Sequence, residues 1–216
     1  MGDPLSATLH VAAHPGDAGA GDVPHLGDAL PLCASDPRWL AVALADLDAV
    51  HADHLHCERK AAQSALSLVR SYPERADLVL AMAQLAHDET RHVIQVARLL
   101  SRRGQPASYD QGDDYAAELG THIRGREPDR LLDRLLVFAV IEGRSAERLA
   151  LLAGALEDPR ARELYASLAD AEVRHRDAFL ALARDAAPEA WRSRAAELAA
   201  LEAELLAHRT ILARVH

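Results

Sequence analysis

Residues 85–96 read LAHDETRHVIQV, and residues 168–179 have a similar arrangement, LADAEVRHRDAF. Each stretch carries a glutamate followed three residues later by a histidine, first as Glu89 and His92 and again as Glu172 and His175. Side chains three residues apart on an α-helix lie on the same face. In both stretches this face also carries the regularly spaced apolar side chains, so we expect both pairs to point into a helical core.

Two further glutamates extend this pattern along the chain. Glu58 precedes Glu89 by 31 residues and Glu142 precedes Glu172 by 30 residues, and each lies on the apolar stripe of its own helical stretch. One Glu from each of two helices and a Glu-x-x-His from each of two others is the arrangement of di-iron and di-manganese carboxylate bundles. The predicted metal ligands are Glu58, Glu89, His92, Glu142, Glu172 and His175.

The charges of these six residues favour the same interpretation. Four carboxylates buried together without cations are unfavourable and would take up protons instead. Two divalent ions balance the four negative charges, and two neutral imidazoles complete the ligand set. Carboxylate and imidazole donors suit iron or manganese, and we expect two iron ions, with manganese as the less favoured choice. Any one of these residues taken alone is better explained as a surface glutamate or core histidine; the common register of all six favours a metal centre.

The rest of the sequence predicts an all-α fold, a four-helix bundle with an additional C-terminal helix. Helical spacing of apolar residues extends from Trp39 to about Arg70 and from about Glu74 to Arg103. Glu127-Pro128-Asp129 opens a third long helix that ends near Leu156, Asp158-Pro159 opens a fourth that lasts to about Asp185, and a fifth helix starts at Pro188. A short helix is expected from Tyr115 to Ile123, within the roughly 23-residue connection between two helical hairpins. Residues 1–34 are expected to be a loose leader, and residues 35–216 a single helical domain.

Composition excludes several classes of protein. Only 4% of the 216 residues are aromatic, which disfavours a β-sandwich. Two cysteines exclude a disulfide scaffold or a four-cysteine metal site, and the net charge of −9 disfavours coating of nucleic acid by bulk positive charge. We find no secretory signal and no transmembrane segment, and therefore expect a cytoplasmic protein.

Several nearby residues are secondary candidates. Asp88 and Asp170 either orient an imidazole through its second nitrogen or are solvated helix charges. His54 is expected to line a cavity, and Tyr165 to be a packing residue. The remaining expectations are that Cys57 is structural, that His51 and His56 have no special role, and that Glu147 pairs at the surface with Arg144 or Arg148.

Four segments resemble the MiaE family of tRNA-(2-methylthio-N6-isopentenyladenosine) hydroxylases: DHLHCERKAAQSAL (53–66), LAHDETRHVIQV (85–96), FAVIEGRSAERLALLA (138–153) and YASLADAEVRHRDAFLALA (165–183). The resemblance covers about residues 37–183 and implies a ferritin-like, non-haem di-iron monooxygenase with the six residues above as iron ligands. It also implies O₂, an electron-donating reductase and tRNA as partners. Gly143 and Ala146 depart from the family pattern, but neither replaces a ligand.

The resemblance carries two expectations about the substrate site. Apolar side chains such as Val137, Phe138 and Leu168 would hold the prenyl group and exclude water. The arginines near the ligand-bearing turns would either form a basic rim for RNA phosphates or pair with surface acids; they are Arg91, Arg144, Arg148, Arg174 and Arg176.

Two other interpretations remain open from the sequence. A ferritin-like ferroxidase, a peroxidase or a manganese catalase would use the same ligands without a tRNA substrate, an apolar pocket or a basic rim. A non-catalytic helical module would bury these acids incidentally and bind no metal.

Overall fold

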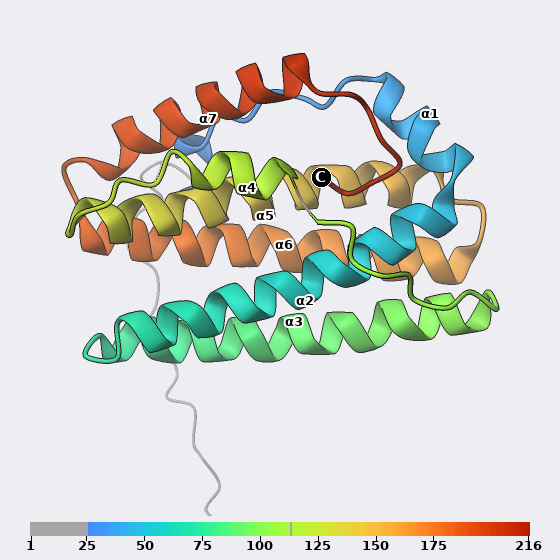
Figure 1. Ribbon diagram of the computed structural model, residues 1–216, viewed down its shortest axis with the longest axis horizontal. Helices are drawn as coiled ribbons and strands as arrows, with labels where there is room; N and C mark the ends of the chain where they lie inside the picture. The colour runs from blue at the N-terminus through green and yellow to red at the C-terminus, as the bar shows by residue number, and fades with distance from the viewer. Residues whose placement is uncertain (1–25, 113) are drawn as a thin grey trace, which may run out of the picture.

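The computed structural model describes residues 26–112 and 114–216. In this part of the chain the regular elements are all helices, joined by turns and loops, with no strand (Figure 1). A short 3₁₀ helix, η1 (Leu26–Ala29), precedes seven α-helices. These are α1 (Arg38–Ala45), α2 (Leu47–Ser71), α3 (Ala76–Arg102), α4 (Asp114–Gly120), α5 (Asp129–Ala155), α6 (Pro159–Ala186) and α7 (Trp191–His208). The predicted all-α bundle with an additional C-terminal helix is confirmed.

The bundle consists of two helical hairpins, α2–α3 and α5–α6, whose partners lie side by side along most of their length (Figure 1). Helix α7 packs mainly on α5, and α4 lies against α5 within the long connection between the hairpins. Aliphatic side chains fill two clusters between these helices, one around Leu135 and Phe179 and the other around Trp39 and Leu168. Along each of the four long helices, the ligand candidates lie between residues of one cluster and residues of the other.

The first long helix is divided, contrary to the continuous helix expected from Trp39 to Arg70. Asp46 leaves the helical conformation, with φ −142° and ψ 69°, and separates α1 from α2. Its carboxylate accepts a 3.1 Å hydrogen bond from the Ala49 amide and so caps the start of α2. Apolar spacing continues across this point, which is why periodicity alone did not reveal the break.

Part of the stretch expected to be a loose leader packs on the bundle. Ala29 and Leu30 are buried in the core, and the half-buried Leu32 packs against it. A Cβ atom on Gly143 would lie 2.8 Å from Cδ1 of Leu32, so the glycine allows this segment to approach α5 closely. This contact gives a structural reason for the glycine at a position where the family pattern differs. Residues 1–25 lie outside the described residues.

The chain after α7 runs back across the bundle and is held by its backbone. The Trp39 indole donates a hydrogen bond of 2.9 Å to the carbonyl of Arg214, and Arg148 donates one of 2.8 Å to that of Val215. The Val215 amide in turn donates to Asp53. These contacts place His216 between α4 and α5, where its ring stacks on Tyr115 of α4 and its Nε2 lies 2.8 Å from the hydroxyl of Ser145 on α5. Within the described ranges, no helix has the length and apolar character needed to cross a bilayer.

Candidate metal centre

Four helices bring the six predicted ligands together in the interior. Glu58 lies on α2, Glu89 and His92 on α3, Glu142 on α5, and Glu172 and His175 on α6. All six are buried, with at most 9% of any residue exposed. Each lies on the apolar stripe of its helix, so the packing that buries the aliphatic side chains also buries the carboxylates.

The six residues form two overlapping groups. Glu58, Glu89, His92 and Glu172 can each offer one ligand atom within 4.8 Å of the others, and so can Glu89, Glu142, Glu172 and His175. Glu89 and Glu172, the glutamates of the two Glu-x-x-His pairs, belong to both groups. The arrangement is therefore suited to two neighbouring metal ions with two shared carboxylates.

The imidazoles face the carboxylates at short range. Nδ1 of His92 lies 3.3 Å from Oε2 of both Glu58 and Glu89. Nδ1 of His175 lies 2.8 Å from Oε1 of Glu89 and 3.1 Å from Oε2 of Glu172. The two imidazole rings are 5.7 Å apart between their centroids, so both nitrogens point toward one compact cluster of oxygens.

The pKa values of these residues show that the cluster favours the binding of positive charge, as protons or as metal ions. Burial, together with the charge of Glu58, raises the pKa of Glu89, and burial with the charges of Glu172 and Glu89 raises that of Glu142 well above its usual range. Burial opposes protonation of His92, but its hydrogen bonds to Glu58 and Glu89 outweigh this and raise its pKa to about 10. In the metal-free protein protons therefore neutralise the site, and a metal ion competes with them.

Two of the carboxylate oxygens also have unused lone pairs. Oε1 of Glu58 and Oε1 of Glu89 are buried and accept no hydrogen bond. Imidazole nitrogens lie near both, at 2.5 Å for His54 and 2.8 Å for His175, but not in hydrogen-bonding geometry. Buried acceptors without donors are uncommon in folded proteins. With only oxygen and imidazole donors in both groups, the residues fit iron or manganese.

A cavity of about 480 Å³ adjoins the centre, between α2, α4 and α5. Three of the six ligand candidates, Glu58, Glu142 and Glu172, contribute to its wall. Apolar side chains line much of the rest, among them Ala61, Ile123, Val137, Phe138 and Ile141. The cavity is large enough for a small organic group to lie against the carboxylates.

A family model described as tRNA-(MS[2]IO[6]A)-hydroxylase (MiaE) matches residues 27–216. The chain belongs to the MiaE family.

Two relatives support this membership. The chain is 41% identical over 180 residues to a tRNA 2-(methylsulfanyl)-N(6)-isopentenyladenosine(37) hydroxylase from Pseudomonas putida, covering 83% of this chain and 87% of that protein. It is 29% identical over 223 residues to the protein of the same description from Salmonella typhimurium, covering 81% and 82%.

A solved structure shares both fold and sequence with the chain. This structure, described as protein 43 with aldehyde deformylating oxygenase activity from Synechococcus, is 36% identical with a TM-score of 0.81. The similarity covers 86% of this chain and 94% of that one. The expected ferritin-like fold is confirmed.

The secondary candidates had mixed outcomes in this MiaE family member. His54, Val137 and Phe138 line the cavity as predicted, whereas Leu168 packs in the core around Trp39 and not in the cavity wall. Asp88 contacts Gln84 and Arg91 and does not orient an imidazole. Asp170 is exposed, and the hydrogen bond found for it is made by its backbone carbonyl, which accepts from Arg174.

The residues around His54 are more closely connected than the sequence indicated. His51 is buried and its Nδ1 lies 2.7 Å from the hydroxyl of Tyr165, on which its ring also stacks. Burial lowers the pKa of His51 to about 4 and raises that of Tyr165. Tyr165 is thus a packing residue, as expected, and His51 is part of the same buried cluster.

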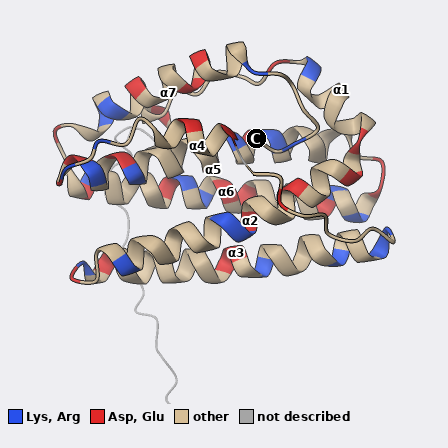
Figure 2. Cartoon of the chain, viewed as in Figure 1, with Lys and Arg blue, Asp and Glu red and all other residues tan. Residues whose placement is uncertain are grey.

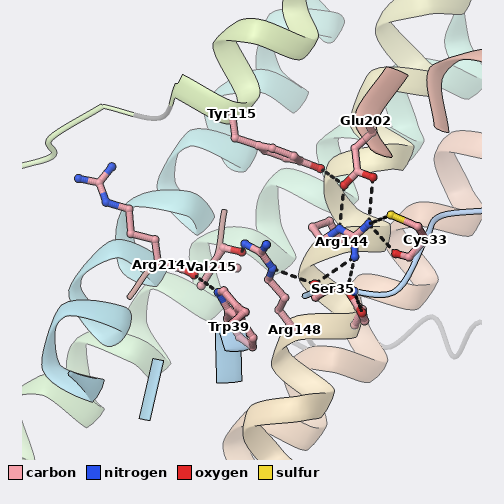
Figure 3. Close-up of polar contacts among 10 residues, drawn as sticks. Cys33, Ser35, Trp39, Tyr115, Arg144, Arg148, Glu202, Arg214 and Val215 are labelled. Carbon is pink, nitrogen blue, oxygen red and sulfur yellow. Dashed lines mark hydrogen bonds and ion pairs between the residues drawn. The ribbon is translucent and has the colours of Figure 1, made fainter. Parts of the chain in front are cut away.

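Two of the five arginines considered for either a basic rim or pairing with surface acids are buried. Arg144 is fully buried on α5 and bonds Glu202 of α7 through both Nε and Nη2, at 2.8 and 2.9 Å (Figure 3). It also pairs with Glu147, as expected, although Arg144 is fully buried and Glu147 half-buried, so this is not a pair of surface side chains. Arg148 is buried beside Ser35 and Trp39. The rim interpretation is wrong for both, because α7 and the C-terminal end of the chain cover this face of α5.

The other three arginines have local partners. Arg91 is exposed and lies 3.7 Å from Asp88, Arg174 donates to a carbonyl of its own helix, and Arg176 pairs with Asp177. The cations that do line the cavity, Lys60 and Arg134, were not among the sequence candidates. A signal existed for Arg134, since residues 134, 138 and 142 follow one another at four-residue spacing on α5.

Proposed function

We propose that this chain is a tRNA hydroxylase that adds a hydroxyl group to the isopentenyl side chain of 2-methylthio-N6-isopentenyladenosine. One observation carries the proposal: two overlapping carboxylate–histidine groups open onto an apolar cavity in a chain of the MiaE family. The relatives from Pseudomonas putida and Salmonella typhimurium are both described as hydroxylases of this nucleoside, which supports the same substrate.

The proposal assigns the six buried residues to two iron ions. Glu58 and His92 would hold one ion, Glu142 and His175 the other, and Glu89 and Glu172 would contact both. Bound iron would supply the O₂ reduction that no protein side chain can carry out. Iron is favoured over manganese by the hydroxylation chemistry, and the electrons would come from a separate reductase in the cytoplasm.

The residues of the chain would bind and orient the substrate. Val137, Phe138 and Ile141 would contact the prenyl group and exclude water from the reacting carbon. The carboxylates would hold the metal ions at the inner end of the same cavity, so that only the end of the inserted side chain reaches them. Positioning of this kind decides which carbon of the side chain reacts.

Nucleoside analysis of tRNA tests the proposal. Deleting the gene in its own organism should abolish the hydroxylated prenyl-adenosine and increase the unhydroxylated form, as measured by mass spectrometry. The wild-type gene should restore the modification, and a gene encoding Glu89→Gln should not. If the ratio of the two nucleosides is unchanged in the deletion strain, the proposed substrate is wrong.

A second candidate follows from the Synechococcus structure. An oxygenase acting on an aliphatic aldehyde would use the same centre and the same apolar cavity. Incubation of the iron-loaded chain with a long-chain aldehyde, O₂ and a reductant distinguishes the two activities. Release of a hydrocarbon without any tRNA hydroxylation would favour this candidate. A ferroxidase, peroxidase or catalase has no need for the cavity, which makes these activities less suited to the structure.

A further inference from the structure

The cavity beside the metal centre has two chemically different ends. At the inner end lie buried carboxylates, among them Glu58 of α2 and Glu142 of α5. Toward the other end the lining becomes polar and more exposed, with Ser64 and Ser67 on α2 and Arg134 on α5. The hydrogen bond of 3.0 Å from Nη2 of Arg134 to Oγ of Ser67 joins the two helices there.

Helix geometry fixes the separation of the two ends. Arg134 lies eight residues before Glu142, and Ser67 lies nine residues after Glu58. At 1.5 Å per residue, the Cα atoms of Arg134 and Ser67 lie about 12–14 Å along their helices from those of Glu142 and Glu58. A prenyl group and a purine ring in series can occupy this distance, with the ribose and its phosphates at the outer end.

The guanidinium of Arg134 has capacity for a further ligand. Its contacts within the described residues are the Ser67 hydroxyl and Tyr72, whose ring centroid is 5.7 Å away and whose hydroxyl donates to Glu127. Arg134 itself forms no ion pair with a carboxylate in this part of the chain. An arginine has five N–H donors in a planar fork that suits a phosphate group. The other cation of the cavity wall, Lys60, lies 3.8 Å from the Asp110 carboxylate. Lysine and arginine on α2 and on the first part of α5 are blue in Figure 2.

We propose that Arg134 binds a backbone phosphate of the RNA next to the modified adenosine, and so sets how far the prenyl group enters the cavity. The inference rests on the proposed tRNA hydroxylase function. The net charge of −9 makes such a local contact important, because the chain as a whole repels RNA. An aliphatic aldehyde has no negatively charged group that Arg134 could bind, so this contact would be specific to an RNA substrate.

RNA binding measured against salt concentration tests the proposal. The iron-loaded chain is titrated with an anticodon stem–loop RNA that contains 2-methylthio-N6-isopentenyladenosine. Arg134→Gln should weaken binding about tenfold and lower the slope of log K against log salt by about 0.7, the value for one contact to a single-stranded phosphate. Arg134→Lys should keep most of the slope. Arg160→Gln is the matched control, because Arg160 is exposed at the start of α6, away from the cavity, and its replacement should leave RNA binding unchanged.

A second measurement separates this inference from the proposed function. Arg134→Gln should lower kcat/KM for the RNA about tenfold relative to kcat/KM for the free nucleoside, which has no phosphate. Iron content reports on folding, and Arg134→Met, which also removes the charge, replaces Arg134→Gln if that variant does not fold. A wild-type slope and an unchanged ratio in Arg134→Gln would overturn the role of Arg134 alone. If the wild-type chain hydroxylates neither the RNA nor the nucleoside, both the proposed function and the role of Arg134 are wrong.

Discussion

At the scale of single residues, the main feature is the difference between shared and unshared carboxylates. Glu89 belongs to both ligand groups, whereas Glu58 belongs to one. We predict that Glu89→Gln lowers iron binding to less than half an ion per chain, and that Glu58→Gln keeps about one ion, because removing a shared ligand weakens both sites. Iron analysis of the purified variants measures this. Asp88→Asn is the control and should bind as much iron as the wild type; equal losses in Glu58→Gln and Glu89→Gln would contradict shared ligation.

The buried carboxyl group of Asp133 leads to a prediction about the stability of the fold at low pH. Burial opposes its ionisation, but hydrogen bonds from Arg124 and Arg194 outweigh this and lower its pKa. A carboxyl group with a lowered folded-state pKa stabilises the fold above its unfolded pKa of about 3.9, and that stability is lost as the pH falls through the folded value.

Asp133→Asn should therefore reduce the free energy of unfolding at pH 7 and flatten its fall below about pH 4. Urea unfolding at a series of pH values provides the measurement. A variant with the same acid dependence as the wild type would show that the pair with Arg124 and Arg194 contributes nothing.

The sequence predicted the residues of the site better than their roles. The three-residue spacing and the shared apolar stripe were enough to predict that Glu89, His92, Glu172 and His175 point into the same core. On an α-helix, the spacing of two residues determines whether they share a face. Which carboxylates belong to both groups depends on the distances between helices, which no local pattern encodes. The position of Arg134 in the cavity wall depends in the same way on the approach of α2 to α5.

At the scale of secondary-structure elements, the break between α1 and α2 depends on one side chain. The Asp46 carboxylate caps α2, and an N-cap residue of this kind contributes about 1 kcal/mol. Asp46→Ala should lower the free energy of unfolding by that amount, as measured by denaturant titration. Asp46→Asn retains an acceptor and should lose only a few tenths of a kcal/mol. Equal stability of the alanine variant and the wild type would exclude a capping role.

The buried pair of Arg144 and Glu202 connects α5 to α7. Both side chains are fully buried, and Tyr115 of α4 also donates to Glu202 (Figure 3). Removing one partner of a buried ion pair leaves an uncompensated charge. We predict that Glu202→Gln lowers the free energy of unfolding by about 3 kcal/mol, because Glu147 still offsets part of the charge.

Two comparisons test the contribution of this pair. Glu204→Gln, an exposed position on the same helix, should change the stability by less than about 0.5 kcal/mol. The double variant Arg144→Met with Glu202→Leu should be more stable than Glu202→Gln, because it leaves no charge buried alone. A Glu202→Gln chain as stable as the Glu204→Gln chain would contradict the prediction.

The helices follow from local sequence patterns, whereas the packing of α7 on α5 does not. The four long helices and the added C-terminal helix followed from apolar spacing and from proline positions, which are local properties. The burial of Arg144 and Arg148 did not, because their partners Glu202 and Val215 lie far along the chain. Packing of α7 and of the segment after it on α5 turns two apparently exposed arginines into internal ones.

At the scale of the whole molecule, two hairpins enclose the candidate centre and leave one cavity beside it. The α2–α3 and α5–α6 hairpins each supply one lone glutamate and one Glu-x-x-His pair, and α4 completes the cavity wall (Figure 1). Under the proposed function this organisation separates the roles of the helices: the hairpin cores would fix the metal ligands, and the space between α2, α4 and α5 would accept the substrate.

The most direct test supplies the iron-loaded chain with prenylated tRNA, a reductant and ¹⁸O₂, followed by mass spectrometry of the nucleosides. The proposed function predicts a hydroxylated prenyl-adenosine that carries one ¹⁸O atom from molecular oxygen. A hydroxyl group derived from water, or tRNA that is recovered unmodified while the chain retains its iron, would contradict it.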